Sequence, residues 1–280
     1  MRLTEASHCY LTVRQQDGYS SYTLTAYRFQ HQALIRDLGN PDVTTITLED
    51  FRRHLVQYPH LQPASLGHKI RAIKGLFRWL EDEDLCVPNP TRKLKEPKLG
   101  QRVPKALTVD ELEWLRDACV TTRDHALVEF FFATGCRVGE VHRLNRQDWD
   151  GFRQAILVLG KGNKEREVYL GSKARIWLHR YLTERQDHDP ALFVTERGAH
   201  RISIHGIQQT FKRIASRCGL AQKVHPHVLR HTLATTLLNQ GAPLVAVQSI
   251  LGHEKPETTQ LYAVLSGEAR HQAHQRYFVQ

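Results

Sequence analysis

The amino-acid sequence predicts a mainly α-helical protein with one small antiparallel β-sheet. Apolar residues recur at helical spacing along most of the 280 residues. Only residues 155–159 and 166–170 have the composition of strands, and a turn at 160–164 rich in glycine and lysine joins them into a hairpin. Four prolines between residues 88 and 105 interrupt the helical pattern. The chain is therefore expected to form two helical lobes, of which the second holds the hairpin.

Composition and charge favour a nucleic-acid partner. The content of 41% apolar and 24% charged residues is typical of a globular protein. Lysine and arginine exceed aspartate and glutamate by 10, which favours a polyanionic partner. An anionic membrane surface is the alternative, but no apolar run approaches the ~18 residues that a membrane span needs. The first five residues do not open a signal peptide, so we expect a cytoplasmic protein.

The cysteines and histidines predict neither disulfides nor a metal centre. The five cysteines are scattered and never spaced as C-x-x-C, so they are expected to be reduced core residues. None of the 17 histidines forms an H-x-x-x-H or H-E-x-x-H pair on a plausible ligand face.

Three helices are predicted in the first lobe. The first is capped by Ser21 and closed by Gly39, the second opens at Thr47 with Asp50 three residues on, and the third runs from Ser65. The third helix buries an apolar stripe, and four basic residues are expected to project from its other faces and could lie along DNA phosphates. They are Lys69, Arg71, Lys74 and Arg78. A merely solvated basic face is the alternative.

Residues 88–105 are predicted to be an extended basic linker. Besides the four prolines, the segment has six basic residues and a single acid, Glu96. Residues 1–105 hold 16 basic and 11 acidic residues and the rest hold 23 and 18, so each part has a net charge of +5. Two lobes joined in this way could embrace a duplex from opposite sides.

The second lobe is predicted to begin with a capping box, Thr108 with Glu111. A second helix ends at Gly135 and a short one follows Arg137. After the hairpin, the pattern predicts five more helices. They cover residues 172–185, 203–218, 227–239, 243–251 and 257–265.

Two residues at the start of one of these helices suit a phosphate group. Pro226 fits the first turn of a helix, which places His227 and Arg230 on one face. Arginine can hold two phosphate oxygens, and histidine can exchange a proton near neutral pH. Alone, the pair would more often be a terminal histidine beside a surface arginine.

Other candidates are weak when taken singly. Arg137 could simply pair with Glu140, and His253 follows the helix-ending Gly252. Tyr262 comes nine residues after His253, and a lone tyrosine in a short helix is usually half-buried packing. A phenol with a pKa of ~10 is a poor nucleophile unless cations and a base surround it.

Together these segments resemble the tyrosine recombinase family, also called the phage integrase family. The similarity is strong over residues 107–265, weaker over 1–100, and greatest to the Xer-type site-specific recombinases. The matching stretches are ATGCRVGE with Arg137, GKGNKERE with Lys161, HPHVLRHTLATTLL with His227 and Arg230, and LGHEKPETTQLY with His253 and Tyr262.

The resemblance implies a domain organisation and a catalytic set. Residues 1–87 would be a SAM-like helical core-binding domain that clamps DNA, 88–105 a linker, and 106–280 the catalytic domain of the DNA breaking-rejoining fold with a C-terminal tail. Tyr262 would attack a phosphodiester and form a 3′-phosphotyrosyl link, without ATP, metal or cofactor. Arg137 and Arg230 would grip the phosphate, and Lys161 would protonate the leaving 5′-oxygen. His227 would be a general acid or base, and His253 would hydrogen-bond the phosphate. Glu140 would orient Arg137 or a neighbour. Lys164 is an alternative to Lys161.

The resemblance also implies partners. Four protomers, identical or of two kinds, would assemble on paired sites in double-stranded DNA. They would exchange strands through a Holliday junction. A second recombinase or an accessory activator would be a further partner. The biological role would be the resolution of chromosome or plasmid dimers or the movement of a mobile element. A type IB topoisomerase and a non-catalytic DNA-binding relative are the alternatives.

Overall fold

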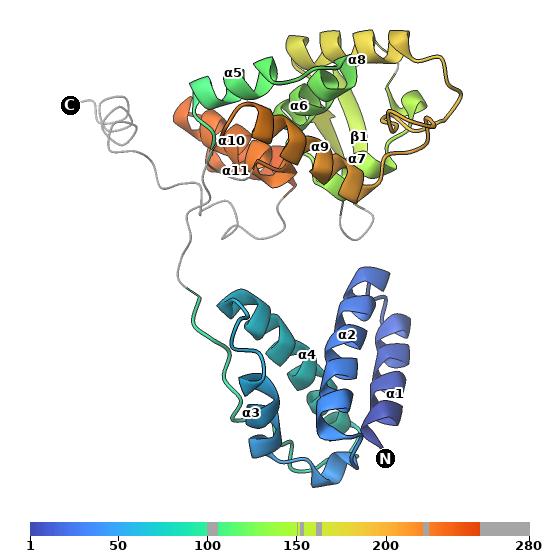
Figure 1. Cartoon of the computed structure of the whole chain (residues 1–280), viewed down its shortest axis with the longest axis vertical. Coiled ribbons are helices and arrows are strands. Elements are labelled where there is room, and N and C mark those ends of the chain that lie inside the picture. The colour runs from blue at the N-terminus through green and yellow to red at the C-terminus, as the bar shows by residue number, and fades with distance from the viewer. Residues whose placement is uncertain (100–105, 150, 152–153, 161–163, 221–223, 253–280) are drawn as a thin grey trace, which may run out of the picture. The chain divides into compact units, whose positions relative to one another are not determined.

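The computed structural model describes residues 1–99, 106–149, 151, 154–160, 164–220 and 224–252. The chain divides into two compact units, Met1–Gln101 and Arg102–Gln280 (Figure 1). The structure is mostly helical with one two-stranded sheet, which confirms the predicted fold class. No helix among the described residues is both long and apolar enough to cross a membrane.

In the described part of the first unit, α1, α2 and α3 pack with α4 into a four-helix bundle. Its elements are α1 (Leu3–Gln16), α2 (Ser21–Leu38), the 3₁₀ turn η1 (Val43–Thr45), α3 (Leu48–Val56) and α4 (Pro63–Asp82). From α4, Ile73 and Phe77 are fully buried, and the Phe77 ring meets that of Phe51 edge to face at 5.0 Å. Burial of this apolar stripe against α1, α2 and α3 holds the unit together.

Helix termini in the first unit follow the predicted capping signals. Thr47 and Asp50 form the expected reciprocal capping box at the start of α3. Gly39 ends α2 in the left-handed conformation, with φ 75°. Ser20, one residue before the predicted Ser21, caps α2, and α4 begins at Pro63 rather than Ser65. Helix α1 was not predicted, and its N-cap residue Arg2 makes no side-chain capping bond.

The segment after α4 packs on the first unit. Leu94 is buried in that unit's core, and Asn89 and Thr91 are buried beside it. The Asn89 Oδ1 accepts from the Thr91 amide at 2.9 Å, and Lys74 Nζ donates to the Leu94 carbonyl at 3.2 Å. The prediction of an extended linker is therefore wrong for residues 89–94, because a single buried leucine and an asparagine-centred turn hold them in place.

The second unit is built around α6. Phe130 and Phe131 of this helix are fully buried, and it packs against α8, α10, α9 and α5. Thr108 and Glu111 form the predicted capping box ahead of α5. The elements are α5 (Val109–Asp117), α6 (Thr122–Thr134), α7 (Val138–Arg143), the 3₁₀ turn η2 (Arg146–Asp148), β1 (Ala155–Leu159), β2 (Glu165–Tyr169), α8 (Ser172–Glu184), α9 (Ile204–Arg217), α10 (Pro226–Asn239) and α11 (Leu244–Leu251). The helix expected at 257–265 lies outside the described residues.

The predicted hairpin is present, with its second strand one residue earlier than expected. Strands β1 and β2 pair antiparallel, from Ala155 opposite Tyr169 to Leu159 opposite Glu165. Alternate residues point inward, and Ile156, Val158 and Val168 are buried against the rest of the unit. This register decides which side chains near the hairpin tip face the site described below.

All five cysteines are free thiols, as expected. Cys86, Cys119 and Cys136 are buried, and Cys9 and Cys218 are partly buried. Burial raises the pKa of Cys119 and of Cys136 to about 12, so both thiols are protonated at neutral pH.

Candidate active site

Arg230 joins two turns that are far apart in the sequence. This residue lies on α10 and is only 3% exposed. Its Nη1 donates to the carbonyl of Gly135 at 2.6 Å, and its Nη2 donates to the carbonyl of Leu251 at 2.7 Å. The guanidinium is therefore fixed between the end of α6 and the end of α11.

Gly135 allows these elements to approach closely. Its φ is 58°, and a Cβ atom on it would lie 2.7 Å from Leu251 Cδ2 and 2.9 Å from Leu233 Cδ2. A left-handed backbone and apolar neighbours on one side explain why the predicted helix terminator is a glycine. Its carbonyl is directed at Arg230 as a result.

Arg137 reaches the same region from the start of α7. Its Nη2 donates to the carbonyl of Gly252 at 3.1 Å, and its Nη1 donates to Glu140 Oε1 at 3.0 Å. The side chain is 35% exposed, so a ligand could still reach it. The two arginines thus bind consecutive carbonyls, those of Leu251 and Gly252, immediately before His253.

Glu140 is a buried carboxylate that accepts four hydrogen bonds, including the one from Arg137 Nη1. Arg137 donates its backbone amide to it at 2.7 Å, and Arg166 donates Nη1 and Nη2 at 2.8 and 2.7 Å. Burial alone would raise the pKa of Glu140, but the hydrogen bonds from Arg166 and Arg137 outweigh burial and hold that pKa below its ordinary value. Glu140 therefore remains ionised, and it accepts two hydrogen bonds from Arg137.

Sequence reasoning missed Arg166, which was assigned only to a strand. The signal was available in the alternation of the hairpin, since Arg166 stands opposite Val158, whose side chain is buried. An arginine at an inward strand position needs a buried anion, and Glu140 supplies it.

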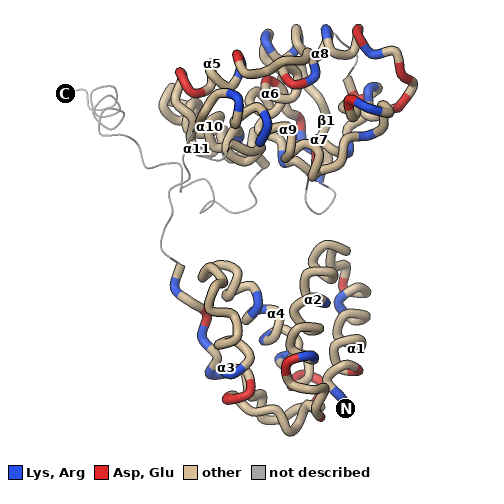
Figure 2. The backbone as a smooth tube through the Cα atoms, viewed as in Figure 1, with Lys and Arg blue, Asp and Glu red and all other residues tan. Residues whose placement is uncertain are grey.

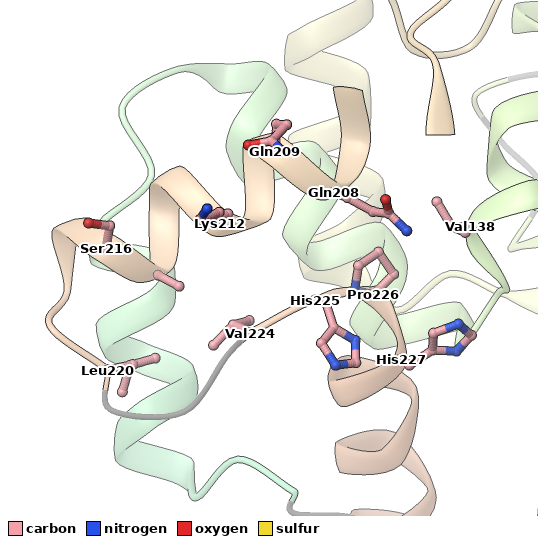
Figure 3. A pocket seen from close by; sticks show the side chains of 11 residues that line it. Val138, Gln208, Gln209, Lys212, Ser216, Leu220, Val224, His225, Pro226 and His227 are labelled. Atoms are coloured by element: carbon pink, nitrogen blue, oxygen red, sulfur yellow. The ribbon is translucent and has the colours of Figure 1, made fainter. Parts of the chain in front are cut away.

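His227 lies at the edge of a cavity of about 610 Å³ between α9 and α10. Figure 3 shows its ring beside that of His225, with Gln208 and Lys212 of α9 on the opposite side. The two imidazoles are 5.9 Å apart, edge to face. Partial desolvation lowers the pKa of His227, and the charges of His225, Arg230 and Arg137 lower it further. These charges act on His227 because the residues lie near one another.

The lowered pKa gives a pH prediction for His227 as a general base. If His227 is the general base, one of the two roles that the resemblance implies, its neutral imidazole is the active form, so acid should slow DNA cleavage only below the ordinary value of 6.5. Single-turnover cleavage measured from about pH 5 to about pH 8 should show this acid limb, and His227→Gln should remove it. An acid limb at or above the ordinary value in the unaltered chain would contradict the assignment.

Lys161, His253 and Tyr262 lie outside the described residues. Lys164 is described and exposed, and its carbonyl accepts from the Gly160 amide at 2.8 Å, which closes the hairpin tip. The choice between Lys161 and Lys164 as general acid thus stays a prediction.

The basic residues of the first unit are not equivalent. Lysines and arginines lie along α4 and the segment after it (Figure 2). Arg71 and Arg78 are exposed, and Arg71 pairs with Glu96 at 2.6 Å. Lys69 is only 3% exposed, and its Nζ lies 3.8 Å from the centre of the Tyr58 ring. The expectation that Lys69 projects from the helix is wrong, because its ammonium group is enclosed between α3 and α4.

Comparisons with known proteins identify relatives along the whole chain. Residues 105–268 match the phage integrase family. The chain is 36% identical over 275 residues to the tyrosine recombinase XerC of Oceanobacillus iheyensis, covering 92% of this chain and 90% of the relative. It is similar to the crystal structure of XerA recombinase, with 28% identity, a TM-score of 0.57 and 99% of both chains covered.

A further structure shares the fold. It is the post-cleavage complex of XerH site-specific recombinase bound to a palindromic difH substrate. The TM-score is 0.73 at 22% identity, with 89% of this chain and 78% of that chain covered.

The family match covers more than half of the chain and includes every expected catalytic residue. The alignment with XerC extends the similarity across nearly all of the remainder. The chain therefore belongs to the phage integrase family of tyrosine recombinases.

Proposed function

We propose that this recombinase cleaves and rejoins DNA at specific sites through a covalent bond to Tyr262. One observation carries the proposal: Arg230 and Arg137 donate to the consecutive carbonyls of Leu251 and Gly252. The two cations that would hold a phosphate are thereby tied to the backbone that leads into His253 and Tyr262. A protein that only bound DNA would need basic charge but no such convergence on one point.

The chemistry follows from the residues of the site. The Tyr262 oxygen attacks the phosphorus and loses its proton to His227, while the 5′-oxygen leaves with a proton from Lys161, or from Lys164 as the alternative. Arg137 and Arg230 neutralise the charge of the five-coordinate transition state, and His253 donates to a phosphate oxygen. One phosphate ester replaces another, so religation by the reverse reaction needs no ATP. These cations and proton donors supply what a metal would, so we propose that no metal or cofactor takes part.

The proposed substrate is double-stranded DNA, bound by four protomers on paired sites. Related structures include XerH bound to a palindromic difH substrate and a lambda integrase dimer bound to a core site. We propose that residues 1–87, with residues 89–94 packed on them, and residues 106–280 clamp the duplex, with Arg71, Lys74 and Arg78 toward the phosphates. Lys69 would not contribute in its enclosed position. The chain would act on the nucleoid in the cytoplasm, with a second recombinase or an accessory activator as further partners.

A suicide-substrate assay tests this proposal. A nicked duplex, carrying a site selected from random DNA by binding to the full chain, should trap a denaturant-resistant protein–DNA adduct, because the short cleaved strand diffuses away. Adding a chelator should leave the yield unchanged. Cleavage without an adduct, or loss of the adduct on chelation, would contradict the mechanism. Relaxation of supercoils without recombination of paired sites would favour the type IB topoisomerase alternative, which the family match and the XerC similarity do not support.

A further inference from the structure

Arg166 lies where three parts of the candidate site meet. It is the second residue of β2, its side chain is 13% exposed, and both of its terminal nitrogens bind Glu140. The flanking residues Glu165 and Glu167 are exposed, as the strand alternation requires. The hairpin is thereby attached to α7 through one buried bidentate ion pair.

The hairpin tip rests directly on this ion pair. Gly160 is the first tip residue, and a Cβ atom on it would lie 3.4 Å from Arg166 Nη1 and 3.7 Å from Glu140 Oε1. Its amide donates to the Lys164 carbonyl at 2.8 Å across the tip. Arg166 therefore lies beside Gly160, which is bonded across the tip to Lys164.

Arg166 also supports the turn that ends α11. A Cβ atom on Gly252 would lie 2.8 Å from Arg166 Cδ and 3.0 Å from its Nε. The Gly252 carbonyl accepts from Arg137, which shares Glu140 with Arg166. One guanidinium thus contacts the hairpin tip, the carboxylate that orients Arg137, and the residue before His253.

We infer that Arg166 is a positioning residue that places the lysine of the hairpin tip, the proposed general acid, against the 5′-oxygen of the phosphate held by Arg137. This inference rests on the proposed function. Lysine cannot replace arginine here, because a single ammonium group cannot bind both carboxylate oxygens and support the glycines on either side. A displaced tip would leave the phosphate bound but the leaving oxygen without its proton.

The leaving group provides a specific test. We expect Arg166→Lys to slow adduct formation on the ordinary suicide duplex about 10²-fold, as a poorly placed general acid does. A duplex with sulfur in place of the bridging 5′-oxygen needs no proton on departure, so the same variant should react on it within about 5-fold of the unaltered chain. Lys161→Ala and Lys164→Ala, made as two separate variants, are the reference. The variant that has lost the general acid should be slow on the oxygen duplex and rescued on the sulfur duplex.

Two further variants separate positioning from folding. Arg116→Lys is a matched control, since Arg116 also makes a buried bidentate pair, with Glu129 Oε1 and Oε2 at 2.5 and 3.0 Å, in the same unit. Arg116→Lys should lower the melting temperature about as much as Arg166→Lys does, and it should cleave both substrates at the normal rate. Gly160→Ala keeps the ion pair, and its Cβ would lie only 3.3 Å from the Lys164 carbonyl oxygen. It should therefore displace the tip and reproduce the sulfur-rescued defect even if Arg166→Lys does not fold.

The outcomes distinguish this inference from the proposed function. If the unaltered chain forms no adduct on either duplex, the proposed function fails. If it forms adducts but Arg166→Lys and Gly160→Ala react normally, or are equally slow on the oxygen and sulfur substrates, Arg166 does not position the acid.

Discussion

A chain in which Tyr262 is replaced by phenylalanine is expected to bind its DNA site normally and to form no covalent adduct. The substitution removes one oxygen and keeps the ring, so packing around residue 262 should change little. Without the phenol there is no nucleophile for the phosphorus, and no neighbouring cation can compensate for its absence. The adduct should fall below detection, and DNA affinity should stay within about twofold in a mobility-shift titration.

The control for this experiment is another tyrosine of the same unit. Tyr169 on β2 is 53% exposed, and its hydroxyl donates to Glu167 at 3.3 Å, away from the arginine pair. Tyr169→Phe should therefore form adducts at the normal rate. An adduct that persists in Tyr262→Phe would overturn the assignment of the nucleophile and would direct attention to Tyr277, the other tyrosine after Gly252.

Local signals predicted much of the scaffold of the site. The capping residues Thr47 and Thr108 and the terminator Gly135 were readable because each acts within three or four residues of its own position. The helix beginning at Pro226 was readable for the same reason. Helix α1 was missed because nothing comparable marks its start, and its formation depends on packing Leu3 and Tyr10 into the core.

Long-range placement was beyond sequence reasoning. Nothing in the helical pattern of α4 distinguishes Lys69, which is enclosed beside Tyr58, from Arg78, which is exposed. Arg166 and Glu140 are 26 residues apart, and only the folded hairpin brings them together. The interhelical bonds of Arg230 likewise follow from the tertiary structure, although the residue itself was identified from its motif.

Replacing Arg230 by lysine should nearly abolish cleavage. Its guanidinium binds the carbonyls of Gly135 and Leu251, and one ammonium group cannot reach both while also facing a phosphate. Loss of one preorganised donor to a transition-state oxyanion costs about 10²–10³ in rate, and here the turn before His253 also loses its support. We expect single-turnover adduct formation to fall about 10³-fold, with DNA binding weakened far less because many other phosphate contacts remain.

Part of this loss could come from destabilisation, since a carbonyl left without its donor in the interior costs about 1–3 kcal/mol. Arg123 offers the comparison. It is 6% exposed in the same unit, and it donates to the Val194 carbonyl at 3.3 Å and to Glu196 at 2.7 Å. Arg123→Lys should lower the free energy of unfolding by a similar amount and leave cleavage intact at temperatures where both variants are folded. If Arg230→Lys cleaves as fast as Arg123→Lys, then Arg230 only holds the backbone at Gly135 and Leu251 in place. Arg137 would then be the one arginine of the pair that neutralises the transition-state charge.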